Sequence, residues 1–214
     1  MKDLGLMDGC TVYMVGSVQE EDCDGLSLMH LIQKEGVKPN VVVLTEETEL
    51  NLHRGHRGRM EIRVVTKGRS CHGSMPHLGE NAVYRMAPII REIEQLNSRL
   101  RDDPFLGKGT VTVSRIECRT LSLCAVPDEC AIYLDRRLTA GETRESALAE
   151  VRALPGAKGA RVEVLQYKVK SWTGLTVEQE KYFPGWVIPE AHRAVRAGVK
   201  AGQTALGKRP VIGR

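Results

Sequence analysis

Short apolar runs flank a helical pattern in the first 50 residues of the chain. Residues 11–17 and 40–45 are the apolar runs, and residues 26–34 between them place apolar positions at helical spacing. A strand-helix-strand order of this kind is a βαβ unit and predicts parallel strands. Because a sheet of two parallel strands does not stand alone, we expect this unit to pack with further strands.

The middle of the chain changes to a different order of elements. Apolar and charged residues alternate along 59–64, which predicts a half-buried strand. Apolar positions recur every three or four residues from Val83 to Leu100, which predicts an amphipathic helix with Pro88 near its start or at a kink. The elements that follow are strands at 110–118 and 129–138, a helix at 143–154 and a strand at 160–169.

This βαββαβ order is that of the ferredoxin-like split βαβ fold. After it, residues 189–207 predict one more helix, and we expect no further strand before the end of the sequence. The fold class predicted for the whole chain is α/β plus α+β, with a partial parallel βαβ part and a ferredoxin-like part.

Charge is distributed unevenly along the chain. Residues 1–52 carry three Lys or Arg against ten Asp or Glu, whereas residues 53–214 carry 28 against 17. An acidic segment with carboxylates at strand ends suits a divalent cation, and the basic remainder suits anionic substrates. Aromatic residues make up only 4% and no stacking motif of the RNA-binding type is present, so we expect no nucleic-acid partner.

Two further features bear on the location of the protein. No apolar stretch approaches the ~20 residues of a membrane span, and residues 1–6 lack the apolar region of a signal peptide. We therefore expect no membrane partner and a cytoplasmic protein. The six cysteines form no Cys-x-x-Cys pair, so we expect free, buried thiols rather than a zinc-finger site.

Carboxylates follow both apolar runs of the predicted βαβ unit. Glu20 and Glu21 come just after the first run, and Glu46 follows the second. Open α/β sheets place their ligands at the carboxyl edge of the strands, so these side chains predict a cation-binding or proton-transfer site. The alternative for the Glu20-Glu21 pair alone is a solvated acidic turn.

Several motifs, taken in order, resemble the M20 peptidases, which include acetylornithine deacetylase and succinyl-diaminopimelate desuccinylase. The segments that carry the resemblance are residues 11–25, Val41-Val-Val-Leu-Thr-Glu-Glu-Thr48, Gly68-Arg-Ser-Cys-His-Gly-Ser-Met-Pro76 and Gly79-Glu-Asn-Ala82. The resemblance implies a catalytic domain into which the ferredoxin-like part is inserted as a lid and dimerisation domain. The division expected is 1–55 for the catalytic part, 56–169 for the lid and 170–214 for a helical return to the catalytic domain.

The resemblance also implies roles for five residues. Glu20 matches the general base, and Glu21 and Glu46 match ligands of two divalent metal ions, zinc first, with cobalt or manganese as alternatives. His72 matches a lid histidine that reaches across a dimer to polarise the scissile carbonyl. Arg137 matches an arginine that binds a substrate carboxylate, a role suited to the forked guanidinium.

Other interpretations of these residues stay open. His72 could be an ordinary loop histidine, and Arg137 could pair with Asp135 or Glu129 on its own sheet. Cys124 stands where the family commonly has asparagine, which puts a second substrate contact in doubt. The four remaining histidines that match no family ligand are expected to be surface or structural residues: His53, His56, His77 and His192.

The resemblance has a large gap. The family's His-x-Asp metal motif is found at none of the six histidines, and its closing histidine ligand has no counterpart, so we expect an internal section of an M20 enzyme. The leading hypothesis is a metal-dependent hydrolase of amide or ester bonds with a reduced or subunit-shared site, acting as a homodimer on N-acyl amino acids, dipeptides or esters. The alternatives are a non-catalytic dimerising module and, less favoured, an anion-binding or nucleic-acid-binding lid.

Overall fold

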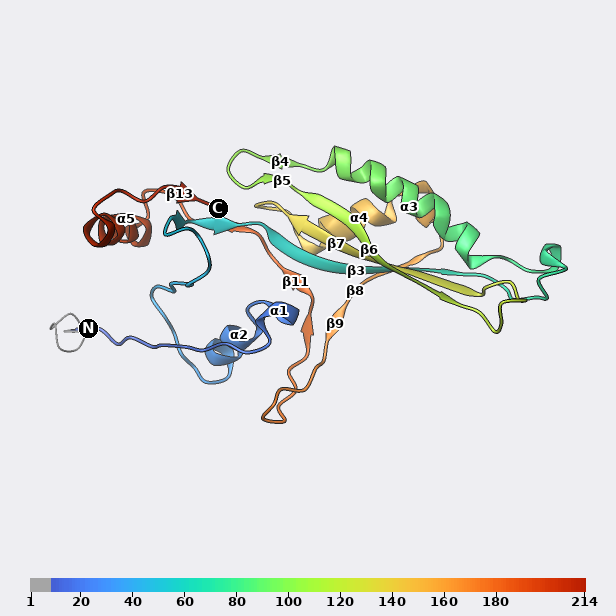
Figure 1. Ribbon diagram of the computed structural model, residues 1–214, viewed down its shortest axis with the longest axis horizontal. Coiled ribbons are helices and arrows are strands. Elements are labelled where there is room, and N and C mark those ends of the chain that lie inside the picture. The colour runs from blue at the N-terminus through green and yellow to red at the C-terminus, as the bar shows by residue number, and fades with distance from the viewer. Residues whose placement is uncertain (1–8) are drawn as a thin grey trace. The chain divides into compact units, whose positions relative to one another are not determined.

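The computed structural model describes residues 9–214 (Figure 1). The start of the chain, on which the signal-peptide argument rests, lies outside these residues. The chain divides into two compact units. The smaller unit consists of the segment up to Asn40 and the segment Tyr167–Gln179, and the larger unit consists of Val41–Gln166 and Glu180–Arg214. The three-part division at 1–55, 56–169 and 170–214 stays a proposal.

The larger unit contains the six predicted elements of the ferredoxin-like part in the predicted order. They are β3 (Gly58–Lys67), α3 (Ala82–Arg99), β6 (Thr110–Arg119), β7 (Glu129–Leu138), α4 (Arg144–Arg152) and β8 (Arg161–Val164). The last predicted strand is shorter than expected and is followed by β9 (Gln166–Tyr167). The βαββαβ prediction is therefore confirmed.

The four long strands form one antiparallel sheet in the order β8-β3-β7-β6. Ile62 of β3 lies between Leu134 of β7 and Val164 of β8, which fixes the register at the centre of the sheet. The short strand β11 (Tyr182–Phe183) continues along the same edge of β3 beyond β8. β6 pairs with β7 alone, so its outer edge has no strand partner among residues 9–214.

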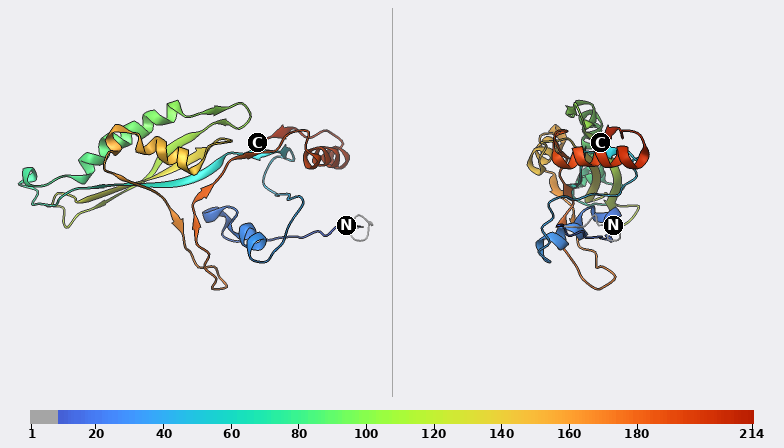
Figure 2. Two further views of the ribbon diagram at one scale, coloured as in Figure 1. Left: turned by 180° about the vertical axis from the view of Figure 1, so that it is seen from behind. Right: turned by 90° about the vertical axis from the view of Figure 1, so that its left-hand side faces the viewer.

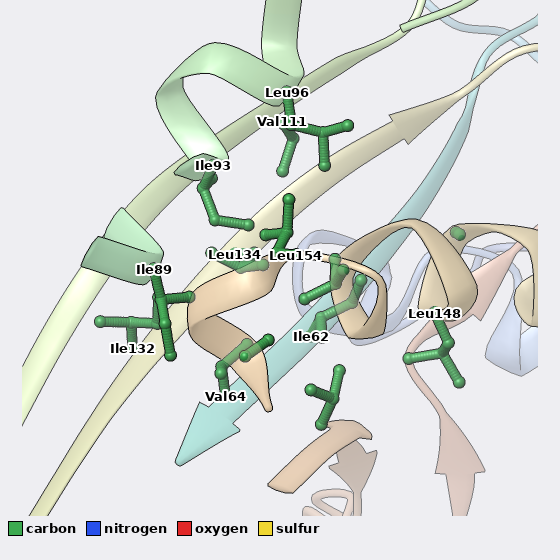
Figure 3. Packing of buried hydrophobic residues seen from close by; sticks show 14 of the residues in the cluster. Ile62, Val64, Ile89, Ile93, Leu96, Val111, Ile132, Leu134, Leu148 and Leu154 are labelled. Atoms are coloured by element: carbon green, nitrogen blue, oxygen red, sulfur yellow. The ribbon is translucent and has the colours of Figure 1, made fainter. Parts of the chain in front are cut away.

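Helices α3 and α4 pack on one face of this sheet (Figures 1 and 2). The apolar side chains that alternate along β3 and β7 meet those of α3 and α4 in a single core, drawn in Figure 3. Asn81 caps α3 by accepting the backbone N–H of Val83 at 2.9 Å. The helix runs through Pro88 as one element, although proline at the seventh position has no N–H to donate to the carbonyl of Tyr84.

Short strands and a final helix complete the larger unit. They are β1 (Leu52–His53), β2 (Gly55–His56), β4 (Asp102–Asp103), β5 (Gly107–Lys108), β12 (Trp186–Val187), α5 (Arg193–Leu206) and β13 (Ile212–Gly213), with 3-10 turns at Pro76–Leu78 and Pro155–Ala157. The expectation of no strand after the last helix is wrong, because β13 pairs in parallel with β1. Two-residue strands carry no periodic pattern, so the sequence gives no signal for them.

The smaller unit contains two short helices, α1 (Glu20–Cys23) and α2 (Leu26–Gln33). The helix predicted at 26–34 is confirmed. The strands predicted at 11–17 and 40–45 are not formed in the described structure, where both segments run without strand pairing. Their apolar side chains lie open to solvent, with Met14 97% and Val43 80% exposed. A strand needs a neighbour to pair its backbone groups, and no described segment provides one for either run.

Two short strands lie where the chain passes between the units. β9 pairs with β10 (Gln179–Glu180) as a two-stranded sheet.

Within residues 9–214, no helix combines the length and the apolar character needed to cross a membrane.

Candidate active site

Glu20 and Glu21 form the first turn of α1, a helix of only four residues. The helix starts after Gln19, which has a left-handed backbone with φ of 59°, and its inner residue Cys23 is fully buried. Both glutamates are exposed. Consecutive helical residues project in different directions, so Glu20 and Glu21 are not placed to hold one ion together.

Tyr167 is a neighbour of α1 that the sequence did not single out. Its side chain is 3% exposed. Burial raises the pKa of the Tyr167 phenol, and the nearby Asp22 and Cys23 raise this pKa further, while a hydrogen bond with Gln19 opposes the shift. This tyrosine therefore lies close to the turn that presents the two glutamates. Strand periodicity marks it only as a buried position.

Glu46 lies in the unpaired segment 41–47 and is exposed. It belongs to the larger unit, whereas Glu20 and Glu21 belong to the smaller one. The convergence of the three carboxylates on one edge of a sheet stays a prediction.

Zinc sites in proteins take three or four side-chain donors close together. Among residues 9–214 no group of three or more His, Cys, Asp or Glu side chains is placed to hold a metal ion. Two or three carboxylates alone bind a transition metal weakly and without the imidazole preference of zinc. The described residues therefore do not fit a complete dinuclear site by themselves.

His72 lies in the loop between β3 and α3, and its backbone is fixed against the loop between β6 and β7. It forms an antiparallel bridge with Ala125. On either side of it, the Gly73 N–H donates to the Cys124 carbonyl at 2.6 Å and the Val126 N–H donates to the Cys71 carbonyl at 2.9 Å. The imidazole itself is exposed. The loop thus holds a solvent-facing histidine on an ordered backbone.

Arg137 lies on β7 and pairs with Asp135 of the same strand. Its Nε donates to Oδ1 at 2.7 Å, and its Nη2 donates to Oδ2 at 2.9 Å. The expected alternative of a pair on its own sheet is therefore confirmed, and the role in binding a substrate carboxylate stays a prediction. Its neighbour Arg136 points to the helix-covered face, where it is 1% exposed and forms ion pairs with Glu142 and Glu150.

The four histidines that matched no family ligand are all exposed. The ring of His56 meets that of Trp186 edge to face at 5.2 Å. His192 caps α5 by accepting the Ala194 N–H at 3.2 Å. All six cysteines are free thiols, but the expectation that they are buried holds only for Cys23 and Cys130.

Two hollows on the described surface have none of the five candidate residues in their lining. One of about 520 Å³ lies beside α5, lined by Val195, Arg196 and Lys200 among others. One of about 250 Å³ lies in the smaller unit, lined by residues that include Val15 and Trp172. Neither is lined by a candidate catalytic group.

Comparison with known proteins decides the family. The family model for the peptidase dimerisation domain of M20 enzymes matches residues 54–163, which contain the ferredoxin-like part up to the last residue of β8. The chain belongs to the M20 peptidase family. Its fold class, an α/β part with a ferredoxin-like dimerisation domain, is that of the family.

M20 relatives in bacteria and fungi are similar to the chain over different lengths. The Escherichia coli K12 protein named "Uncharacterized protein YgeY" is 50% identical over 214 residues, covering 99% of this chain and 53% of that protein. A probable carboxypeptidase of Aspergillus fumigatus is 31% identical over 126 residues, covering 55% of this chain and 28% of that protein. The chain thus spans about half the length of YgeY and less of the carboxypeptidase.

Solved structures of M20 type share the fold at low sequence identity. A tripeptidase from Staphylococcus aureus Mu50 aligns with a TM-score of 0.57 at 17% identity, covering 92% of this chain and 49% of that one. The aminopeptidase PepT from Bacillus cereus aligns with a TM-score of 0.52 at 17% identity, covering 77% and 40%. At this identity the likeness concerns the fold alone.

Proposed function

We propose that the chain forms part of a metal-dependent hydrolase of amide bonds, with ester bonds as an alternative, that uses a reduced or subunit-shared metal site. The observation that carries this proposal is the match to the M20 peptidase dimerisation domain over residues 54–163. The printed names of similar proteins, a probable carboxypeptidase, a tripeptidase and an aminopeptidase, favour amide bonds. N-acyl amino acids and dipeptides are the proposed substrates, and zinc, cobalt or manganese the proposed metal.

In this proposal the adjacent glutamates have different roles. Glu20 takes up a proton from the attacking water, and Glu21 and Glu46 are metal ligands. The divergence of consecutive side chains on α1 supports a division of labour between Glu20 and Glu21. His72 donates a hydrogen bond to the substrate carbonyl oxygen, and Arg137 binds the substrate carboxylate.

The test combines elemental analysis with a hydrolase assay. The protein, purified without added metal, is analysed for bound metal and assayed on N-acyl amino acids, dipeptides and simple esters with and without a chelator. Removing a general base slows hydrolysis by about 10²- to 10⁴-fold, so Glu20→Ala is expected to lose this much activity, and Glu21→Ala to lose activity together with bound metal.

Glu47→Ala is the matched control, because Glu47 is also exposed and lies directly beside Glu46. It is expected to keep the wild-type rate. Unchanged turnover in both Glu20→Ala and Glu21→Ala, or in excess chelator, would remove these carboxylates from the mechanism.

A second proposal is that the chain forms a homodimer through the outer edge of β6. The family match to a dimerisation domain supports it, as does the absence of a strand partner on that edge among the described residues. An open edge of this kind is a template for pairing with another chain. If the chain dimerises without metal and hydrolyses none of the three substrate classes, it acts as a non-catalytic dimerising module. Size-exclusion chromatography with light scattering, with and without chelator, separates the two functions.

The cytoplasmic location stays the prediction made from the sequence. The free state of the six cysteines agrees with a reducing compartment.

A further inference from the structure

The side chain of His72 is bound at one ring nitrogen by the residue two positions later. Ser74 places its hydroxyl oxygen 2.7 Å and its backbone nitrogen 3.2 Å from Nδ1 of His72. A backbone N–H can only donate, so Nδ1 of His72 must accept. The Ser74 hydroxyl, which could otherwise accept or donate, must then also donate to Nδ1.

Two donors on Nδ1 determine where the neutral imidazole carries its hydrogen. With Nδ1 occupied as an acceptor, the hydrogen lies on Nε2. No described residue bonds to Nε2, and the side chain is exposed. His72 therefore presents an N–H donor to any ligand that approaches the loop.

We propose that Ser74 is a positioning residue that fixes His72 as its Nε2–H tautomer, so that Nε2–H donates to the carbonyl oxygen of the substrate. The identity of the substrate, an amide or ester, rests on the proposed function. The tautomer of His72 rests on the geometry of its contacts with Ser74. Negative charge develops on the carbonyl oxygen as water adds to it, and a donor that is already oriented stabilises this charge without reorganisation. The opposite tautomer would present a lone pair to that oxygen and repel it.

The same chain contains a histidine with the opposite arrangement. Nδ1 of His56 lies 2.7 Å from the carbonyl oxygen of Arg57, which can only accept, so neutral His56 carries its hydrogen on Nδ1. His192 has the same tautomer as His72, because its Nδ1 accepts the backbone N–H of Ala194 at 3.2 Å and its hydrogen therefore lies on Nε2. These two rings serve as internal references for the two tautomers.

The tautomers are read directly from long-range ¹H–¹⁵N spectra of the ¹⁵N-labelled 214-residue chain. Spectra are recorded near pH 8.5, about two pH units above the ordinary pKa of histidine, so that the rings are neutral. We expect His72 to show the Nε2–H pattern of His192 and to differ from His56. The assignment comes from the loss of one ring signal in His72→Gln.

Two variants of Ser74 test whether the serine causes this preference. Ser74→Ala removes the hydroxyl and keeps the backbone N–H, so the ratio of the Nε2–H to the Nδ1–H tautomer is expected to fall about fivefold, the net effect of one typical hydrogen bond. Ser74→Thr retains a hydroxyl and is expected to restore the ratio. A Nδ1–H pattern in the wild-type chain, or ring nitrogen shifts of His72 that are the same in Ser74→Ala, would overturn the proposal.

The spectra need no substrate, so their outcome is independent of the hydrolase assay. If the assay detects hydrolysis, Ser74→Ala is expected to lower kcat with little change in KM, and Ser74→Thr to recover it. If no substrate is cleaved while the tautomer result holds, the proposed function fails and the role of Ser74 in fixing the ring stands. Hydrolysis with an unaltered kcat in Ser74→Ala would overturn the role of Ser74 in the reaction.

Discussion

Ile116 on β6 and Ile132 on β7 lie directly opposite each other in the sheet, yet Ile132 is fully buried and Ile116 is 54% exposed. Opposed residues of antiparallel strands project from the same face. On this face Ile132 packs in the core with Ile89 and Ile93 of α3, as Figure 3 shows. Ile116 stands on the edge strand, where the core ends.

This difference predicts unequal losses of stability for the same truncation. Ile132→Ala leaves a cavity in a closed core and is expected to lower the free energy of unfolding by about 2–5 kcal/mol. Ile116→Ala removes a half-exposed side chain and is expected to change it by no more than about 0.5 kcal/mol. Urea denaturation followed by circular dichroism, at concentrations low enough to keep the chain monomeric, measures both. Equal losses would show that the edge is as closely packed as the centre.

A charge at Ile116 tests the proposed dimer. Ile116→Asp places a carboxylate on the open edge of β6, and burying it against a second copy is unfavourable, so the dimer dissociation constant is expected to rise at least tenfold. Sedimentation equilibrium measures the constant. Val169→Asp is the control, because Val169 is an exposed apolar residue of the smaller unit. The β6 interface is excluded if Ile116→Asp dimerises as the wild type does, or if the control weakens the dimer equally.

The sequence predicted the ferredoxin-like part well because its signals are local and periodic. Alternation along 59–64 and helical spacing from Val83 to Leu100 describe one buried face each, and the structure places those faces together. The runs at 11–17 and 40–45 are as apolar as true strands, but a strand forms only where a neighbour pairs with it. Such partners are a tertiary property that no local pattern records.

The candidate site was predicted by motif, and its local contacts were not. Two examples are the proximity of Tyr167 to α1 and the hydrogen bond between Ser74 and His72. Both depend on side-chain geometry, which produces no periodic pattern in the sequence. Arg136 and Arg137 look equivalent in the sequence. Alternation along β7 sends one into the core and the other to the open face, and only the structure shows which face is covered.

The buried guanidinium of Arg136 predicts a large effect of losing its partner. Glu142 pairs with Arg136 and also accepts the Thr139 hydroxyl at 2.7 Å. Glu142→Ala leaves the buried charge with Glu150 as its one remaining carboxylate partner, beside the Arg137 carbonyl, and is expected to cost about 3–5 kcal/mol of unfolding free energy. Thermal and urea denaturation measure it.

Glu145→Ala is the matched control for this variant. Glu145 lies on α4 with a side chain that is 75% exposed, and it is expected to change stability little. A loss in Glu142→Ala no greater than that in the control would contradict the importance of the buried pair.

Cys118 and Cys130 are opposed on β6 and β7, and only Cys130 is buried. Burial raises the pKa of the Cys130 thiol, and the nearby Cys118 raises this pKa further. Only the thiolate is alkylated, so iodoacetamide is expected to modify Cys118 much faster than Cys130 at neutral pH. Mass spectrometry of quenched time points measures both rates. Equal rates would contradict the burial of Cys130.

The same shift has a defined effect on stability. Because the pKa of Cys130 is higher in the folded chain than in the unfolded chain, its contribution is complete below the unfolded pKa and is lost as the pH rises toward the folded value. Cys130→Val should therefore lose less unfolding free energy than the wild type between about pH 8 and pH 10. Cys118→Val is the comparison: it keeps the buried thiol of Cys130 and should lose more unfolding free energy over this range than Cys130→Val.

The pair of Arg137 with Asp135 makes a prediction about substrate binding. A forked guanidinium binds one carboxylate through Nε and Nη2, so a substrate carboxylate that uses this geometry must displace Asp135. Asp135→Asn keeps the shape and removes the charge. If Arg137 binds the substrate, this variant is expected to lower KM for N-acyl amino acids about two- to fivefold, the range for partly exposed ion pairs.

The measurement compares each N-acyl amino acid with its carboxamide, which lacks the anionic group. Asp135→Asn should change KM for the acid alone, and Arg137→Ala should raise KM for the acid and leave that for the amide unaltered. Asp128→Asn is the control, because Asp128 forms a similar ion pair with Arg119. If Asp135→Asn raises KM, or if acid and amide respond alike, the ion pair is part of the sheet's own structure and Arg137 does not bind the substrate carboxylate.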